Sequence, residues 1–374
     1  MDNNVKFKPV RMFHPGITLR EKLEELGMSV KEFALRSSKP EKTINAVLNG
    51  DSSITPEMSV AFEQITMIPA RVWLNIQRGY DEYIARKKRE EIYKDKTTIA
   101  WTKSFPYAEI SRLEWVPSTR IMSEKIENLF AFFKITSVKA WENYYLNQEL
   151  KSAFRISLAG TKNPYSISVW LRKGELLASE MTTKNPYSEA LLKDKLPQML
   201  SLVQEQPTDF AILLKELCSE AGVKLIYVNY ITHAPINGCA RWIEDTPCIQ
   251  MTDKQKRNDI FWFSFFHEIG HILLHGKKDV FLEDNAYLDQ QREKENEADT
   301  FASNLLLSKQ AENKIIQEIQ EKHISKNLIK TLAEKYQTHP AIIIGRLQHK
   351  GLLRHDMLND FMVHISLFDE KQAE

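Results

Sequence analysis

Apolar residues recur at helical spacing in two long stretches of the C-terminal half of the chain. Asp259–His275 reads DIFWFSFFHEIGHILLH, an apolar run that has no proline and a single glycine, Gly270. The run is long enough for a buried helix of about four turns. Arg292–Leu307 reads REKENEADTFASNLLL, and its apolar positions recur at i, i+3 and i+4. That spacing predicts a second helix with one face against the core.

The first 90 residues show shorter apolar repeats, which are separated by helix-capping residues. Ser29 and Glu32 form a capping box of the S-x-x-E type. Thr55 is a helix cap, and Pro56 follows it at the first helical position. The pattern predicts five short helices, with a tight turn at Ser37–Pro40 between the second and the third. This arrangement is typical of a helix-turn-helix domain.

Between these regions the pattern predicts mainly helices and no recognisable chemistry. Lys87–Lys96, KKREEIYKDK, is highly charged and predicts a helix end followed by a linker. Residues 120–190 look largely helical, with buried positions in Leu129–Phe133 and Val169–Leu177. We therefore predict an α+β fold that is mainly α. Its three predicted parts are a helix-turn-helix domain (1–90), a helical spacer or partner-binding region (91–205) and a C-terminal domain (206–374).

Composition narrows the class of protein. The chain has 374 residues, enough for two or three domains, and 43% of them are hydrophobic, enough for a normal core. A net charge of +1 argues against nucleic-acid binding by charge over the whole surface. There is no apolar signal region and no run long enough to span a membrane. We expect a cytoplasmic protein with no membrane partner.

The three cysteines have no CxxC spacing, which predicts free thiols in a reducing compartment. Cys239 and Cys248 flank a predicted hairpin, so a regulatory disulfide between them is the alternative.

The first predicted apolar helix contains the polar sequence His-Glu-Ile-Gly-His at residues 267–271, whose side chains can bind a metal ion. Residues four apart on a helix lie about 40° apart around its axis, so His267 and His271 project from one face as two ligands of one metal ion. Glu268 reaches the same site and can take a proton from a water that the metal activates. Two histidines and a carboxylate favour zinc, although iron or manganese also accept them. The structural alternative is a buried helix whose histidines bond backbone carbonyls.

A catalytic zinc site usually has a third protein ligand, and the second helix offers candidates. Glu295 and Asp299 are four residues apart, so Glu295 can bind the metal while Asp299 holds a ring nitrogen of His267 or His271. Glu297 is the competing ligand. It lies about 200° around the helix from Glu295, so the two glutamates should not reach the same ion.

His275 adds a further polar residue to the stripe that carries the two histidines. It could be an outer donor to the metal site, an oxyanion-stabilising group, or a helix-end charge before Gly276, and the helix-end role is preferred.

HEIGHILLH followed by ENEADTFASNLLL resembles the ImmA/IrrE family of zinc metallo-endopeptidases. In that family the glutamate three residues before the alanine of E-x-x-A-[ND]-x-F-A is the third ligand, which implies Glu295. Leu217–Val228 resembles the helix-then-strand entry to the catalytic domain, Ile236–Trp242 its small-residue turn, and Pro247–Thr252 its edge strand. Gly345–Gln348 resembles its C-terminal helical extension. The resemblance implies a gluzincin-like domain with a small sheet and a protein substrate, typically a partner repressor.

The first 90 residues contain a set of short motifs at the helix ends and within the last predicted helix: His14-Pro15-Gly16, Leu48-Asn49-Gly50, Ile54-Thr55-Pro56, Trp73-Leu74-Asn75 and Tyr80-Asp81. With these motifs the region closely resembles the HigA-type antitoxins, which are Xre-like regulators. The resemblance implies that Glu41–Leu48 is the recognition helix in the major groove of operator DNA. Lys42, Thr43 and Asn45 are its exposed candidates, and Lys39 would lie at the phosphates.

Some positions depart from the HigA pattern. Val30 stands where the family commonly has a phosphate-binding glutamine, Ser38 replaces the turn glycine, and Glu41 puts a negative charge near the DNA. Residues 1–90 hold 15 Lys and Arg against 12 Asp and Glu, a difference of only +3. A domain that now serves dimerisation or toxin binding is therefore the alternative to DNA binding. Reading operator half-sites would require a homodimer.

Together these patterns predict a transcriptional regulator or antitoxin with a zinc-dependent endopeptidase domain. Its partners would be operator DNA and a protein substrate, either a repressor or a component of a toxin system. One alternative is an antitoxin that represses its operon and neutralises a toxin by binding, with a structural or vestigial metal site. A second alternative is a scaffold without zinc.

Overall fold

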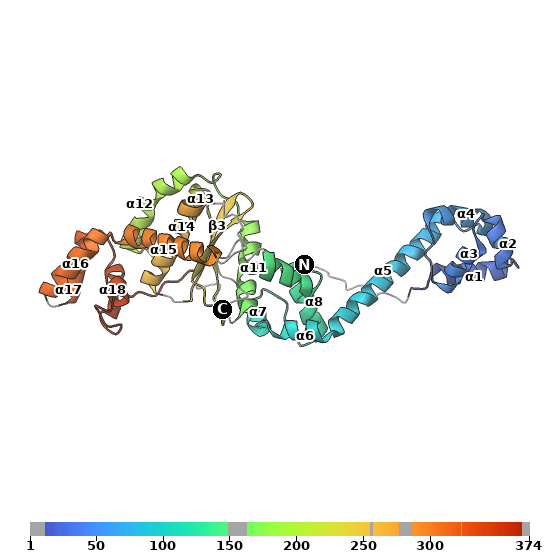
Figure 1. The fold of residues 1–374 in the computed structure, drawn as a ribbon, viewed down its shortest axis with the longest axis horizontal. Helices are drawn as coiled ribbons and strands as arrows, with labels where there is room; N and C mark the ends of the chain where they lie inside the picture. Colours follow the sequence, from blue (N-terminus) through green and yellow to red (C-terminus); the bar gives the residue numbers. More distant parts are fainter. Residues whose placement is uncertain (1–11, 149–162, 255–256, 277–285, 323, 369–374) are drawn as a thin grey trace. The chain divides into compact units, whose positions relative to one another are not determined.

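The structure is a computed structural model, and it describes residues 12–148, 163–254, 257–276, 286–322 and 324–368. The chain divides into two compact units, Met1–Ile99 and Ala100–Glu374. Both are built mainly of helices, and the described residues of the second unit add a three-stranded sheet (Figure 1). The predicted α+β class with mainly α content is confirmed.

The N-terminal unit contains the predicted five helices, whose ends follow the capping residues. The Ser29 hydroxyl accepts a hydrogen bond from the Glu32 N–H at 3.2 Å, and the Thr55 hydroxyl accepts one from the Met58 N–H at 3.2 Å. Gly50 ends the third helix with φ at 81°. The helices are α1 (Pro15–Glu25), α2 (Val30–Arg36), α3 (Glu41–Asn49), α4 (Pro56–Thr66) and α5 (Ala70–Lys94).

The turn between α2 and α3 has the helix-turn-helix geometry although it lacks the family's glycine. Ser38 has a φ of 53°, in the left-handed region that glycine adopts most easily. The helices close on a core that includes Phe33, Ile44, Phe62 and Trp73. The apolar face of α3 is therefore buried, and its opposite face is left for solvent or a partner.

The helix end predicted within Lys87–Lys96 is confirmed at Lys94, but the predicted linker is wrong, because α5 runs without a break to Lys94 and the next helix begins at Lys96. Ion pairs along the helix offset its charge: Arg86 pairs with Glu82 at 2.6 Å, and Lys94 with Glu91 at 2.6 Å. The segment contains no glycine or proline after Gly79 that could end the helix. Charge density alone was therefore a poor sign of a linker.

The second unit consists of helices and the sheet. The division between the units falls within α6 (Lys96–Lys103), after Ile99. The predicted helical character of residues 120–190 holds over the described part of that range. The remaining helices are α7 (Tyr107–Arg112), α8 (Met122–Phe133), α9 (Val138–Trp141), the π-helix η1 (Glu142–Gln148), α11 (Pro164–Glu180), α12 (Glu189–Glu205), α13 (Phe210–Glu220), α14 (Asn258–His275), α15 (Ala286–Leu306), α16 (Lys309–Glu321), α17 (Lys326–Lys335), α18 (Pro340–His349) and the 3-10 helix η3 (Asn359–Phe361).

The sheet has the order β1-β3-β2, with β1 (Lys224–Val228) parallel and β2 (Gly238–Ile243) antiparallel to β3 (Thr246–Thr252). The predicted edge strand, Pro247–Thr252, is therefore the central strand. The predicted small-residue turn, Ile236–Trp242, lies largely within β2, which is one of the two edge strands of this sheet. Pro247 lacks an N–H group, which favours an edge position in the sequence, but it stands at the start of a strand that is otherwise buried on both sides.

A buried ion pair fastens α11 to the sheet. The Arg241 guanidinium on β2 donates to the Glu175 carboxylate on α11 at 2.9 Å and to the Leu171 carbonyl at 3.1 Å. Glu175 also accepts a hydrogen bond from Arg172 at 2.7 Å. Part of the predicted spacer therefore packs directly against the sheet.

The cysteines are free, as the sequence predicted, and all three are buried. In the β2–β3 register Cys239 is opposite Gln250 and Cys248 is opposite Arg241, so the two thiols are not partners across the hairpin. Burial raises the pKa of the Cys248 thiol to about 11 and raises the pKa of the other two thiols as well.

α14 is the central helix of the second unit and contacts β2, β3, α15 and α18. Its apolar residues Phe261, Trp262, Phe265 and Phe266 belong to the main core. Within the described ranges, no helix combines the length and the apolar character needed to cross a membrane.

Candidate metal centre

The candidate site lies where α14 and α15 cross, and two small residues allow the close approach. A Cβ atom on Gly270 would lie 3.3 Å from the Cα of Ala298 and 3.1 Å from the Phe301 ring. Glycine on α14 and alanine on α15 therefore let the two backbones pack tightly. The polar stripe of α14 consequently faces the polar residues of α15.

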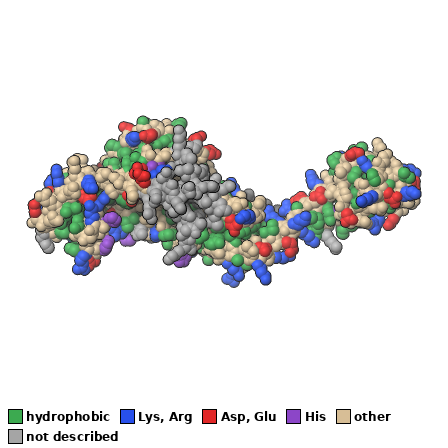
Figure 2. Space-filling view, in the orientation of Figure 1, with side chains coloured by type: hydrophobic (Ala, Val, Ile, Leu, Met, Phe, Trp, Pro, Cys, Tyr) green, Lys and Arg blue, Asp and Glu red, His purple; other side chains and the backbone are tan. Residues whose placement is uncertain are grey.

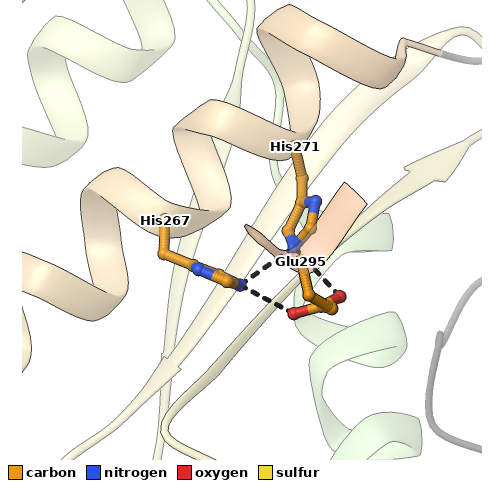
Figure 3. Close-up of side chains that lie close together, drawn as sticks. All are labelled: His267, His271 and Glu295. Carbon is orange, nitrogen blue, oxygen red and sulfur yellow. Dashed lines mark hydrogen bonds and ion pairs between the residues drawn. The ribbon is translucent and has the colours of Figure 1, made fainter. Parts of the chain in front are cut away.

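His267, His271 and Glu295 converge in this crossing (Figure 3). The two imidazoles extend from one face of α14, with their Nε2 atoms 2.9 Å apart. The Glu295 carboxylate reaches them from α15, with one oxygen 3.2 Å from His267 Nε2 and the other 3.4 Å from His271 Nε2. The structure thus brings together the three residues that the sequence proposed as ligands.

The donor set fits a zinc ion. Ligand atoms about 2.0–2.2 Å from a tetrahedral zinc ion are separated from one another by roughly 3.3 Å, close to the three separations at this site. Two Nε2 lone pairs and a carboxylate also need a cation or a shared proton between them, because otherwise they would repel each other. His267 and Glu295 are partly buried and His271 is buried, so water screens that repulsion only in part.

The pKa shifts of His267 and Glu295 also indicate that the site favours a positive charge. Burial by itself lowers the pKa of His267, but hydrogen bonds to Asp299 and Glu295 outweigh it and raise that pKa to about 10. Burial raises the pKa of Glu295, but the hydrogen bonds from His267 and His271 hold it well below its usual range. A proton is therefore held among these groups at neutral pH when no metal replaces it.

Asp299 and Glu297 lie beside different histidines. An Asp299 oxygen lies 2.8 Å from Nδ1 of His267, on the side of the ring away from Glu295. Glu297, the competing ligand, lies instead 2.9 Å from Nε2 of His275. His275 in turn places its Nδ1 3.1 Å from Nδ1 of His271.

The helix-end role that the sequence favoured for His275 does not include this contact with His271. The signal was present in the sequence, since His275 follows His271 by four residues and shares its helix face. The pairing with Glu297 was not visible, because it depends on how the two helices cross.

Glu268 is buried at the wall of a cleft of about 660 Å³ that also reaches His267. A Cβ atom on Gly238 would lie 3.3 Å from the Glu268 carboxylate, so the edge strand β2 borders the same space. The residues that line the cleft from α15 and α18 include Asp299, Ser303, Ile342 and Arg346. Glu268 therefore faces a space that can admit a chain segment.

The candidate DNA-binding residues lie on the N-terminal unit. On α3, Lys42 and Asn45 are exposed and Thr43 is half-buried. Lys39 forms an ion pair with Glu57, so an intramolecular partner already holds its charge. Figure 2 shows positive and negative side chains mixed over the visible face of this unit, in agreement with its small excess of positive charge.

Two family models match the chain, one in each unit. A model of the IrrE N-terminal-like domain, of the M78 peptidase family, matches residues 222–348, which include all the residues of the candidate metal centre. A helix-turn-helix model matches residues 19–66, which contain α2, the turn and α3. Both resemblances predicted from the sequence are confirmed.

Individual relatives match the first unit. Over 73 residues the chain is 32% identical to the HTH-type transcriptional regulator YddM of Escherichia coli, covering 20% of this chain and 78% of that protein. Over 69 residues it is 33% identical to virulence-associated protein A of Dichelobacter nodosus, covering 18% and 68%. A solved HigA-family addiction module antidote protein from Coxiella burnetii is 32% identical, with 23% of this chain and 96% of that chain covered and a TM-score of 0.22. The chain thus belongs to the Xre-type helix-turn-helix regulators and joins their domain to an IrrE/ImmA-like domain of the M78 peptidase family.

Proposed function

We propose that this chain is a DNA-binding regulator whose second unit is a zinc-dependent endopeptidase acting on a partner protein. The observation that carries the proposal is the convergence of His267, His271 and Glu295 beside the buried Glu268. The match to a peptidase family that is usually zinc-dependent supports the choice of metal.

In this proposal His267, His271 and Glu295 hold the zinc ion. When bound, zinc supplies the positive charge that polarises a peptide carbonyl and makes an attacking water more acidic. Glu268 takes the proton of that water as general base and passes it to the leaving amine. Asp299 accepts a hydrogen bond from His267 Nδ1 and so directs the Nε2 lone pair of that ring to the metal.

The cleft supports a polypeptide as the substrate class. The cleft runs from His267 and Glu268 past Gly238 on the edge strand β2 and along α18. An extended peptide can pair with a sheet edge through its backbone, which brings a scissile bond close to Glu268 without requiring one particular side chain. A repressor or another component of a toxin system is the partner that we propose as substrate.

Two variants test the peptidase. Purified wild-type protein should contain about one zinc per chain, and His267→Ala should lose it. Glu268→Gln should keep the zinc but cleave a synthetic peptide library at least about 100-fold more slowly, since the general base is removed. Equal cleavage by wild type and Glu268→Gln would refute the role of Glu268. Unchanged regulation in cells by a variant that no longer cleaves would instead support a regulator that works by binding a partner such as a toxin.

The proposal for the first unit is operator binding through α3. Lys42 and Asn45 are exposed on that helix, and the helix-turn-helix match covers it. Lys42→Ala should weaken binding to operator DNA in a shift assay. The slope of log affinity against log salt concentration should decrease by about the amount expected for one phosphate contact. Lys87→Ala, a matched charge change on α5, is the control. Binding that does not change with salt would contradict the proposal.

A further inference from the structure

His275 and Glu297 form a second hydrogen-bonded arm of the metal centre, opposite the arm formed by Asp299. The His275 side chain is 3% exposed, although it stands at the last position of α14. Its Nε2 lies 2.9 Å from a Glu297 oxygen, and its Nδ1 lies 3.1 Å from Nδ1 of His271. The three side chains therefore form a continuous line that begins at a half-exposed carboxylate and ends at a candidate ligand.

The chemistry at the Glu297 end determines the proton positions along this line. A carboxylate can only accept, so Nε2 of His275 must donate its hydrogen to Glu297. With a metal on Nε2 of His271, that ring would carry its hydrogen on Nδ1 and would donate it to Nδ1 of His275. A His275 ring that donates to Glu297 from Nε2 has the lone pair on Nδ1 that this bond requires. In His267, by comparison, Nδ1 donates directly to Asp299.

We infer that His275 and Glu297 are positioning residues that select the metal-binding tautomer and orientation of His271. The inference rests on the proposed metal site. The two ligand histidines would then be controlled differently: His267 directly by a carboxylate, and His271 by a carboxylate acting through an intervening imidazole. Glu297 thus has a role in the metal site although it is not a ligand.

A charge reversal at Glu297 separates this role from a general effect of charge. In Glu297→Lys the new ammonium group can only donate, so it favours a His275 ring that accepts at Nε2 and carries its hydrogen on Nδ1. That hydrogen faces His271 and favours the tautomer with a hydrogen on Nε2, so the nitrogen that faces the site has no lone pair for a metal. Glu297→Ala removes the carboxylate without imposing the opposite tautomer. Glu293→Lys makes the same change of charge at an exposed position one turn earlier on α15 and is the matched control.

The first readout is zinc affinity of the full chain, measured by competition with a chromophoric chelator. Glu297→Lys should bind zinc about 10–100-fold more weakly than wild type, Glu297→Ala should be intermediate, and Glu293→Lys should match wild type. Equal affinities of wild type and Glu297→Lys would overturn the inference, and so would an equal loss in both lysine variants. Wild type that binds no zinc would instead reject the proposed metal site itself.

The second readout is the tautomeric state of the histidine rings in zinc-loaded protein, observed by ¹H–¹⁵N NMR with labelled histidine. Wild type should show His271 with its hydrogen on Nδ1 and His275 with its hydrogen on Nε2. If Glu297→Lys fails to fold, His275→Asn and His275→Phe make the same comparison, because asparagine keeps an acceptor near the Nδ1 position and phenylalanine does not. Zinc binding that is equally weak in His275→Asn and His275→Phe would overturn the inference.

Discussion

His14 precedes α1, and its Nδ1 accepts a hydrogen bond from the Gly16 N–H at 3.0 Å. The ring also packs edge-on against Tyr80, with the ring centroids 4.9 Å apart. This cap requires a neutral ring, because a protonated Nδ1 has no lone pair to accept the hydrogen bond. The resemblance to HigA antitoxins identified His14 as a matching residue, and its cap gives that match a physical reason.

The stability of α1 should therefore depend on pH. Burial lowers the pKa of His14, although Asp81 and Asp51 oppose the shift. A lowered folded-state pKa means that the contribution of His14 is present above the unfolded value of about 6.5 and is lost as the pH falls below it. The protection factors of the α1 amides, which correct for the pH dependence of intrinsic exchange, should fall between pH 7.5 and pH 5 more in wild type than in His14→Asn, whose cap does not titrate. Identical behaviour of the two proteins at both pH values would contradict this.

Local residue patterns predicted the candidate ligands well, and they left the outer partners open. The i, i+4 spacing of His267 and His271 is sufficient to place both rings on one face of a helix. Whether Glu295 or Glu297 meets them depends on the rotation of α15 against α14. That rotation depends on contacts such as the one between Gly270 and Ala298, which are far apart in the sequence. The spacing of Glu295 and Asp299 favoured Glu295, and the family resemblance implied the same choice.

At the scale of elements, local signals determined the helices and non-local contacts determined the sheet. Ser29, Thr55 and Gly50 mark helix ends through bonds to nearby backbone, so the first unit was predicted closely. The order β1-β3-β2 depends on a parallel pairing between strands that are separated by β2 in the sequence. The family resemblance implied an edge strand at Pro247–Thr252, whereas that parallel pairing makes this strand central.

The contact between α11 and β2 gives a prediction for stability. Glu175 holds two guanidinium groups, and the side chains of Arg241 and Glu175 are only 4% and 18% exposed. Glu175→Leu should lower the free energy of unfolding of the second unit by about 3–5 kcal/mol, because it leaves buried positive charge without its carboxylate. Arg241→Met should cost less, since Glu175 still pairs with Arg172. Urea titration of the full chain measures both, and an equal or reversed order would be evidence against the ion pair.

At the scale of the whole molecule, the two units should respond differently to metal. The described metal donors all belong to Ala100–Glu374, so zinc should stabilise that unit alone. At a free zinc concentration 100 times the dissociation constant, the gain should be about 2.7 kcal/mol. Calorimetry with zinc and then with a chelator should move the transition of the second unit only, and His271→Ala should abolish the shift. Movement of both transitions together would indicate a site shared by the units or a non-specific effect.

The burial of all three native thiols makes the chain suitable for site-specific labelling. A thiol reacts with maleimides as the thiolate, and burial both raises the pKa of these thiols and blocks access to them. Cysteines introduced for Leu35, which is 74% exposed, and for Ile212, which is 55% exposed, would be labelled without first removing the native ones. A fluorophore pair at these two positions would report, by energy transfer, how far apart the units lie as DNA or zinc is added.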